Sequence, residues 1–223
     1  MLYKYILFDL DGTLTNPKTG ITKSVTYALK KIKNIDANLD DLTKFIGPPL
    51  KESFMDFYDF TEEEAKEAIL YYREYFVDHG IYENEIYEGI KELLEDLQKT
   101  NTYVLAVATS KPTKFAELII KHFGLDEYFT SIVGSNLDGT RTKKSEVIEE
   151  VLLRLSIKDK REVVMIGDRQ HDILGAKEMV IDSIGVTYGY GTYDELKRAG
   201  ANYIVNSIQG LRDLLLSCDY SLS

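Results

Sequence analysis

Tryptophan is absent from this chain of 223 residues, and cysteine occurs once, at Cys218. A single cysteine cannot form an internal disulfide, so the disulfide framework of a small secreted domain is excluded. The first residues lack the basic region and apolar core of a secretory signal, and no apolar run approaches the roughly 18 residues that cross a bilayer. We therefore expect a cytoplasmic protein without a membrane partner.

Positive charge is also scarce. Lysine and arginine together number 27 against 37 aspartates and glutamates, which gives a net charge of −10. Such a charge repels DNA, RNA and anionic lipid, so we expect no nucleic-acid partner. An anionic substrate would need a local group of cations or a bound metal ion. Apolar residues at 44% and charged residues at 29% are typical of a globular chain and exclude a disordered one.

Short apolar runs, rich in β-branched and aromatic residues, alternate with segments of helical spacing. The runs read as strands that are buried on both faces, which is typical of a parallel sheet covered by helices. We therefore predict an α/β fold with a doubly wound, mainly parallel sheet. The predicted strands are 3–8, 103–108, 131–133, 163–166, 183–186 and 203–205, and the helical spacing covers 90–97, 115–122 and 147–155.

One long interval after the first predicted strand contains no convincing strand. It reads as helical, with a capping box at Thr61 and Glu64 and a loop at residues 47–49. We interpret it as a small helical domain, residues 16–83, inserted into a core domain of residues 1–15 and 84–223. A packing elaboration of the core is the alternative interpretation.

Two carboxylates, Asp9 and Asp11, follow the first predicted strand, and Gly12 comes directly after them. In an open parallel sheet the carboxyl ends of the strands are where ligands bind. Glycine at this place allows a sharp turn or the close approach of a ligand. A calcium loop would require glycine and glutamate at its sixth and twelfth positions, where this chain has Leu14 and Gly20. The calcium interpretation is therefore excluded.

A second acidic pair, Asp168 and Asp172, follows the predicted strand 163–166. If the sheet is parallel, both pairs emerge at the same edge and converge there. Two unit charges about 4 Å apart repel by roughly 4 kcal/mol at an effective dielectric of about 20, so clustered carboxylates require a cation or raised pKa values. Oxygen ligands of this kind suit Mg²⁺ when phosphate is the substrate. Solvated loop acids are the alternative interpretation.

Candidate phosphate donors follow the predicted strand 103–108, where Thr109, Ser110 and Lys111 come before a helix. Hydroxyls and free backbone amides at a helix start can bind an anion. A basic run at 141–144 precedes another helix and could neutralise a phosphoryl group. Other mechanisms lack their residues: the segment 134–141 misses the lysine of a P-loop, no GxSxG motif occurs, and the three histidines are too scattered for a zinc site.

Four segments, in order, closely resemble the signatures of the haloacid dehalogenase-like hydrolase superfamily. They are DLDGTLT at residues 9–15, TSKP at 109–112, Lys144, and GDRQHD at 167–172. The chain is most similar to the phosphoglycolate phosphatase-like branch, whose members carry a helical cap after the first strand. The strand-free interval matches the place of that cap.

The resemblance implies roles for individual residues. Asp9 would be the nucleophile that forms an aspartyl-phosphate, and Asp11 would protonate the leaving oxygen and later activate water. Lys144, preferred here to Lys143 because it stands directly before Ser145 and an acid, would offset the charge of the transferring group. The remaining implied residues are Gly12, Thr109 and Ser110 for the phosphate, and Asp9, Asp11, Asp168 and Asp172 for Mg²⁺, with direct ligation by Asp172 left open.

These expectations describe a phosphoric monoester hydrolase that acts on a small phosphorylated metabolite, as a monomer or a homodimer. Phosphoglycolate, nucleoside 5'-monophosphates, sugar phosphates and pyrophosphate all stay open as substrates. One alternative is a sugar phosphomutase of the β-phosphoglucomutase type. The non-enzyme alternative is a regulatory domain that is phosphorylated at Asp9. Asp11 argues against dehalogenase chemistry, which does not use an acid at this position.

Overall fold

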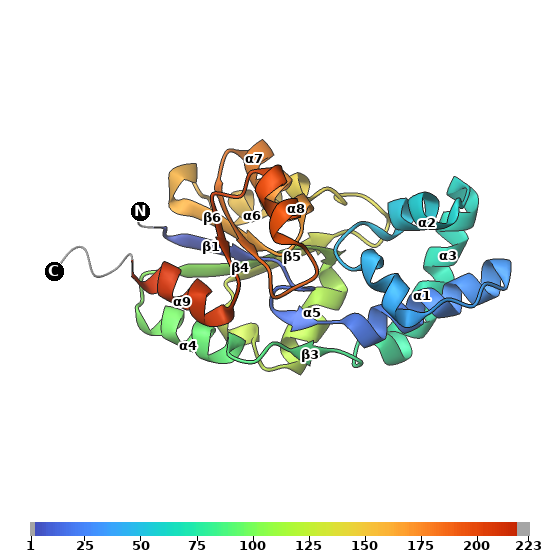
Figure 1. The fold of residues 1–223 in the computed structure, drawn as a ribbon. Coiled ribbons are helices and arrows are strands. Elements are labelled where there is room, and N and C mark those ends of the chain that lie inside the picture. Colours follow the sequence, from blue (N-terminus) through green and yellow to red (C-terminus); the bar gives the residue numbers. More distant parts are fainter. Residues whose placement is uncertain (1–2, 218–223) are drawn as a thin grey trace. The chain divides into compact units, whose positions relative to one another are not determined.

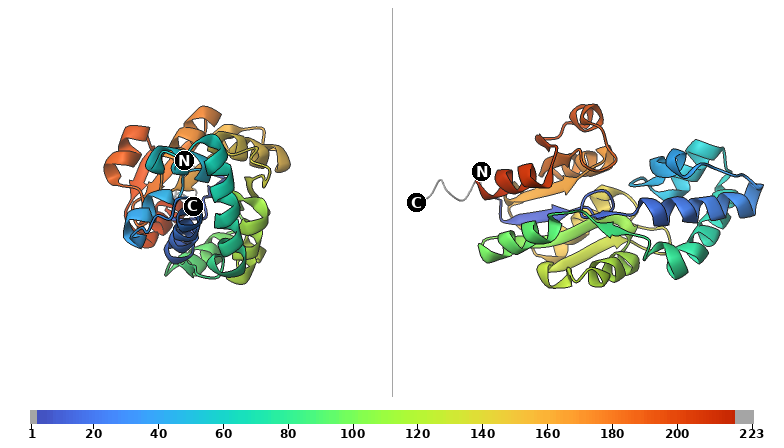
Figure 2. Two further views of the ribbon diagram at one scale, coloured as in Figure 1. Left: turned by 90° about the vertical axis from the view of Figure 1, so that its right-hand side faces the viewer. Right: turned by 60° about the horizontal axis from the view of Figure 1, so that its bottom comes forward.

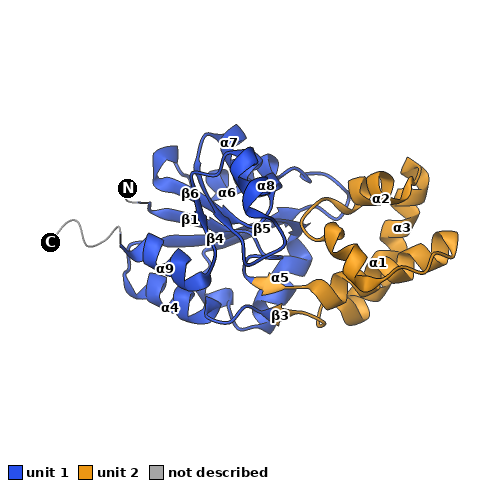
Figure 3. Ribbon diagram, viewed as in Figure 1, with its two compact units in different colours: residues 1–14, 86–223 blue, residues 15–85 orange. Residues whose placement is uncertain are grey.

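The computed structural model describes residues 3–217 and divides into two compact units (Figure 3). The first unit comprises residues 1–14 and 86–223, and the second comprises residues 15–85. The boundaries predicted from the sequence, after residue 15 and before residue 84, lie beside these.

The first unit is built on a six-stranded parallel sheet with the strand order β5-β4-β1-β6-β7-β8 (Figure 1). In the centre, Phe8 of β1 lies beside Val107 of β4 and beside Ile166 of β6. The six strands predicted from the sequence are confirmed. Their bounds are Tyr5–Phe8 for β1, Val104–Pro112 for β4, Ser131–Ser135 for β5, Val163–Gly167 for β6, Asp182–Val186 for β7 and Tyr203–Val205 for β8.

Helices cover both faces of this sheet, with α4, α5 and α9 on one face and α6, α7 and α8 on the other (Figures 1 and 2). The predicted doubly wound α/β fold is therefore confirmed. The chain builds one half of the sheet from β1 outward and then returns to place β6 beside β1, so the strand order reverses between these two strands. The helices are α4 Ile90–Lys99, α5 Thr113–His122, α6 Lys144–Arg154, α7 Gln170–Met179, α8 Tyr193–Ala199 and α9 Ile208–Leu216.

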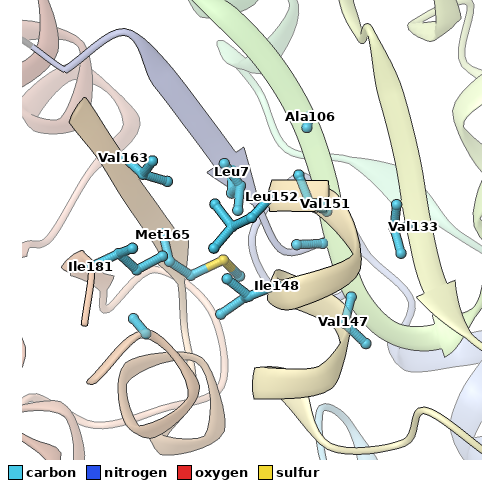
Figure 4. Packing of buried hydrophobic residues seen from close by; sticks show 12 residues of the cluster. Leu7, Ala106, Val133, Val147, Ile148, Val151, Leu152, Val163, Met165 and Ile181 are labelled. Atoms are coloured by element: carbon cyan, nitrogen blue, oxygen red, sulfur yellow. The ribbon is translucent and has the colours of Figure 1, made fainter. Parts of the chain in front are cut away.

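The core of this unit explains why its central strands read as continuous apolar runs. All five residues of β6 are buried. On one face of the sheet, Leu7 and Met165 pack against Ile148 and Val151 of α6 (Figure 4). Burying one such side chain contributes about 1.5–3 kcal/mol relative to leaving it exposed. The densely packed strands therefore hold the residues that follow their carboxyl ends on a rigid support.

The second unit is mainly helical, with α1 packed against α3. Its predicted capping box is confirmed, because the Thr61 hydroxyl accepts a hydrogen bond from the Glu64 amide at 3.2 Å and the Glu64 carboxylate accepts one from the Thr61 amide at 2.8 Å. This box begins α3 directly after Thr61. The elements are α1 Lys18–Lys33, a 3₁₀ helix Leu39–Phe45, α2 Leu50–Tyr58, α3 Glu62–Tyr75 and a π-helical turn Phe76–Gly80.

No strand was expected in or beside the interval 16–83, and this expectation is wrong. Two strands of two residues each, β2 at Thr15–Asn16 and β3 at Glu85–Ile86, pair in a small sheet of their own. A strand of two residues has no alternation of apolar and polar side chains, so the sequence gives no periodic signal for it.

Among residues 3–217, no helix has both the length and the apolar character that a membrane span requires. Cys218, the single cysteine of the chain, lies outside the described residues.

Candidate active site

Four carboxylates come together where the strand order of the sheet reverses. Asp9 and Asp11 follow β1, Asp168 follows β6, and Asp172 lies in the first turn of α7. The Asp9 amide donates a hydrogen bond to the Ile166 carbonyl at 2.8 Å, which ties the end of β1 to the end of β6. In open α/β sheets this reversal opens the crevice in which ligands bind. The fold therefore brings both predicted acidic pairs to one place.

Three of these carboxylates form a group that could hold a metal ion. One oxygen each of Asp9, Asp168 and Asp172 lies within 4.8 Å of the others, and all three side chains are buried. Asp9 Oδ1 and Asp172 Oδ1 are buried, and each lies within 2.8 Å of the Lys144 ammonium. Buried carboxylate oxygens gathered in one small volume are the ligands that a hard divalent cation such as Mg²⁺ prefers. The residues present therefore fit Mg²⁺.

Two glycines leave the room that this group occupies. Gly12 has a φ of +87°, which favours glycine, and a methyl group added there would overlap the Asp168 carboxylate. A methyl group at Gly167 would overlap the Asp172 carboxylate in the same way.

Lys144 lies among the carboxylates. Its Nζ is 2.8 Å from Asp9 Oδ1 and 2.7 Å from Asp172 Oδ1, and it donates a hydrogen bond to the Ala108 carbonyl at 3.0 Å. Both carboxylate contacts are buried ion pairs. Lys144 begins α6 and is buried, whereas Lys143 is exposed. The structure thus brings Lys144 into the group and leaves Lys143 outside it.

A second buried lysine, Lys111, belongs to the site; it was expected only as a phosphate donor, and its pairing with Asp11 was not predicted. Lys111 Nζ forms an ion pair with Asp11 Oδ2 at 2.8 Å, and both side chains are at most 10% exposed. Among the described residues, Asp11 Oδ1 has no hydrogen-bond partner. The available signal was weak: Lys111 stands in the TSKP segment, beside two predicted phosphate donors.

Thr109 and Ser110 were expected at the start of the helix that follows β4, and this placement is wrong. The strand continues to Pro112, with an irregular register between Ala108 and Pro112, and α5 begins at Thr113. The buried Thr109 hydroxyl accepts a hydrogen bond from the Lys111 amide at 3.3 Å. The Ser110 carbonyl accepts one from the Ser135 hydroxyl at 2.8 Å. Donors at this position therefore come from an extended strand end and not from a helix terminus.

Burial shifts the proton affinities of the site. Burial, reinforced by the neighbouring carboxylates, raises the pKa of Asp168 well above its ordinary value. Burial also raises the pKa of Asp11, against the attraction of Lys111. It raises the pKa of Asp172 to about 6, partly offset by Lys144. Burial alone would lower the pKa of Lys144, but the Asp172 and Asp9 carboxylates outweigh it and raise that pKa. Four carboxyl and two ammonium groups leave two negative charges uncompensated on full ionisation, which a divalent cation would balance.

A loop after β7, residues 188–191, fixes Asp168. The Tyr190 amide donates a hydrogen bond to Asp168 Oδ2 at 2.7 Å, and the Thr13 hydroxyl lies 3.5 Å from Asp168 Oδ1. The Tyr188 hydroxyl donates to the Thr13 carbonyl at 3.1 Å. Both glycines of this loop pass so close to Asp168 that a side chain would overlap it. Sequence reasoning missed the loop, although alternating glycines after a predicted strand were a usable signal.

Comparison with known proteins indicates the family of the chain. The sequence model of the haloacid dehalogenase-like hydrolases matches residues 6–186. A 5'-nucleotidase of Pseudomonas aeruginosa is 46% identical, over 96% of each chain. The tyrosine-protein kinase PtkA of Mycobacterium tuberculosis is 37% identical, over 94% of this chain and 72% of its own. The crystal structure of a predicted phosphatase from Clostridium acetobutylicum is 52% identical, with a TM-score of 0.94 over 97% of this chain and 100% of its own.

A doubly wound fold with carboxylates and lysines where its strand order reverses is typical of an enzyme that hydrolyses phosphate esters. The chain belongs to the haloacid dehalogenase-like hydrolase family, and within it to the phosphoric monoester hydrolases. The resemblance read from its four sequence segments is therefore confirmed.

Proposed function

We propose that this protein is a Mg²⁺-dependent phosphatase that hydrolyses a small phosphate monoester through an aspartyl-phosphate at Asp9. One observation carries the proposal: three buried carboxylates, those of Asp9, Asp168 and Asp172, share one small volume with the Lys144 ammonium between two of them. Such a group binds a divalent cation and tolerates an incoming dianion. A cytoplasmic location stays a prediction.

The carboxylates of Asp9, Asp168 and Asp172 and the backbone carbonyl of Asp11 would hold the ion. When bound there, Mg²⁺ would supply positive charge that offsets the charge of the phosphate oxygens. The closeness of one buried oxygen each of Asp9, Asp168 and Asp172, all within 4.8 Å of one another, supports this ligand set. Lys144 adds a second positive charge on the side of the group that faces Ala108.

The reaction follows from the remaining groups. A carboxylate oxygen of Asp9 attacks phosphorus, the bond from phosphorus to the ester oxygen breaks, and the leaving oxygen takes a proton from Asp11. Water then attacks the aspartyl-phosphate and gives its proton to Asp11, which releases phosphate and restores Asp9. The raised pKa of Asp11 favours a protonated carboxyl at the first step. Gly12, Thr109 and Ser110 would bind the phosphate oxygens, and the buried Thr109 hydroxyl supports that role.

Residues 15–85 would act as the helical cap domain of the family, close to the 16–83 boundaries predicted from the sequence. We assign substrate choice to this unit and place nucleoside 5'-monophosphates first among the candidates. The relative that is 46% identical supports this order, since it is named a 5'-nucleotidase. Relatives named pyrophosphatase and phosphoglycolate phosphatase, 32% and 24% identical, put pyrophosphate and phosphoglycolate next.

The test measures phosphate release from an aryl phosphate and from a panel of phosphorylated metabolites, with Mg²⁺ and with a chelator. We expect release with Mg²⁺ alone, and none with the Asp9→Asn variant. Asp126→Asn is the matched control, because Asp126 is exposed and lies on a different part of the unit. Activity that survives both the chelator and Asp9→Asn would refute the proposal. Isomerisation of a sugar 1-phosphate without net phosphate release would indicate the mutase instead.

A further inference from the structure

The buried lysine Lys111 has no part in the mechanism described so far. Its side chain is 5% exposed, and its ammonium lies 2.8 Å from Asp11 Oδ2. The other buried ammonium, that of Lys144, contacts the carboxylates of Asp9 and Asp172. The two lysines therefore contact different carboxylates: Lys144 pairs with Asp9 and Asp172, and Lys111 pairs with Asp11.

The ion pair treats the two oxygens of Asp11 differently. Oδ2 faces Lys111, whereas Oδ1 is buried and has no hydrogen-bond partner among residues 3–217. The Lys111 ammonium can only donate hydrogen bonds, so the carboxyl oxygen that faces it must accept one and cannot carry the proton. A half-turn of the carboxyl merely exchanges two equivalent oxygens, whereas any smaller rotation would break the buried contact, which is costly. Lys111 thus selects one orientation, in which Oδ1 is the oxygen that can carry the exchangeable proton.

Several contacts restrain the backbone around Lys111 and so limit the movement of its side chain. The Lys111 amide donates to the Thr109 hydroxyl, and the Ser135 hydroxyl donates to the Ser110 carbonyl at 2.8 Å. Gly134 passes so close to the Lys111 carbonyl that a methyl group there would overlap it. These contacts anchor the strand end on both sides of Lys111.

We propose that Lys111 is a positioning residue for the phosphatase reaction, which holds the Asp11 carboxyl so that Oδ1 meets the leaving oxygen of the substrate. The proposal rests on the function proposed above. Lys111 donates to Oδ2 throughout, while the proton that moves to the leaving oxygen comes from Oδ1. The bonds that form and break are unchanged, and Lys111 affects only the orientation of the Asp11 carboxyl.

The proposal makes the effect of Lys111 depend on the leaving group. An alkoxide needs a proton as it departs, whereas p-nitrophenolate departs readily without one. The ratio kcat/KM covers the steps up to the departure of the leaving group, so it reports this difference. A purely structural role for Lys111 would lower kcat/KM for alkyl and aryl phosphates by the same factor.

The experiment compares Lys111→Met with the full-length wild type on glycerol phosphate and on p-nitrophenyl phosphate. General acid catalysis contributes about 10²–10⁴-fold, so we expect a loss of about 10²-fold in kcat/KM for the alkyl substrate and of less than about tenfold for the aryl one. Lys114→Met, an exposed lysine of α5, is the matched control and should leave both values unchanged. In an Asp11→Asn background, Lys111→Met should cause no further loss on the alkyl substrate.

Several outcomes would overturn the proposal. They are an equal loss on both substrates, no loss on either, or a full additional loss in the Asp11→Asn background. If Lys111→Met does not fold, Lys111→Arg decides, because its longer planar head displaces the carboxyl and should shift the ratio of alkyl to aryl activity in the same direction. A wild type that releases no phosphate from any substrate refutes the phosphatase function and this inference together. An active wild type with an unchanged ratio in the variants refutes the role of Lys111 alone.

Discussion

The metal-free protein should lose stability as the pH rises through the range in which Asp172 ionises. Burial raises the pKa of this carboxyl from 3.8 to about 6. An acid whose pKa rises on folding stabilises the folded state while it is protonated, and this contribution disappears as the pH rises through the folded value. Burial also raises the pKa of Asp168, which acts in the same direction. Acids with lowered pKa values, such as Glu62 at about 2, are ionised above about pH 5 and do not interfere.

The magnitude follows from the position of that pKa. At about pH 5, one unit below it, protonated Asp172 contributes about 1.4 kcal/mol to the free energy of unfolding, and at about pH 8 this contribution is gone. Mg²⁺ should reverse the trend, because a cation bound to the ionised carboxylates stabilises the folded protein. The stabilisation by Mg²⁺ is therefore expected to be larger at about pH 8 than at about pH 5.

Urea unfolding at several pH values, with Mg²⁺ and with a chelator, measures both effects. His171 acts in the opposite direction, because burial lowers its pKa and its protonation favours unfolding. The comparison of wild type with Asp172→Asn isolates the carboxyl, since both proteins keep His171. Identical pH dependence in the two proteins would refute the reasoning, as would equal stabilisation by Mg²⁺ at both ends of the range.

Two substitutions test the remaining parts of the site. Lys144→Met leaves the buried carboxylates of Asp9 and Asp172 without their cation, so we expect a loss of about 3–5 kcal/mol in urea unfolding and the loss of phosphate release, whereas Lys143→Met should change neither; similar behaviour of the two variants would contradict this. Gly12→Ala and Gly139→Ala place a side chain at the same φ of +87°, but only Gly12 faces a carboxylate and Gly139 has open space around it. We expect Gly139→Ala to lower the unfolding free energy by about 1 kcal/mol. Gly12→Ala should lower it clearly more and should also abolish the stabilisation by Mg²⁺. Equal losses in the two variants would show that the Asp168 contact does not matter.

The sequence was sufficient for the sheet and for the meeting of the acidic pairs. Buried parallel strands read as continuous apolar runs, and helices between them indicate parallel crossovers. Asp9 and Asp168 follow two such runs, so their convergence could be predicted without side-chain detail. Lys144 could be chosen over Lys143 only through the resemblance, because either lysine suits a helix start.

The contacts that depend on backbone irregularity could not be predicted. The strand before Thr109 was expected to end at Ala108, but it continues four residues further with a shifted register, and that shift accompanies the pairing of Lys111 with Asp11. The loop at 188–191 contacts Asp168, and although its alternating glycines mark a close approach, they do not say which residue it approaches. Such features depend on how distant segments fit together, whereas periodicity reports only what each segment buries.

The charges of the site give a reason for the metal that is independent of the family. Asp9 and Asp172 share Lys144, Asp11 has Lys111, and Asp168 has the Tyr190 amide. Two negative charges stay uncompensated when all four acids ionise, and at about 4 Å each would repel a phosphate charge by roughly 4 kcal/mol at an effective dielectric of about 20. Protonation of the acids relieves that repulsion but also removes the nucleophile. A divalent cation would relieve it while Asp9 stays ionised, and we therefore expect attack on an anionic substrate at neutral pH to require the cation.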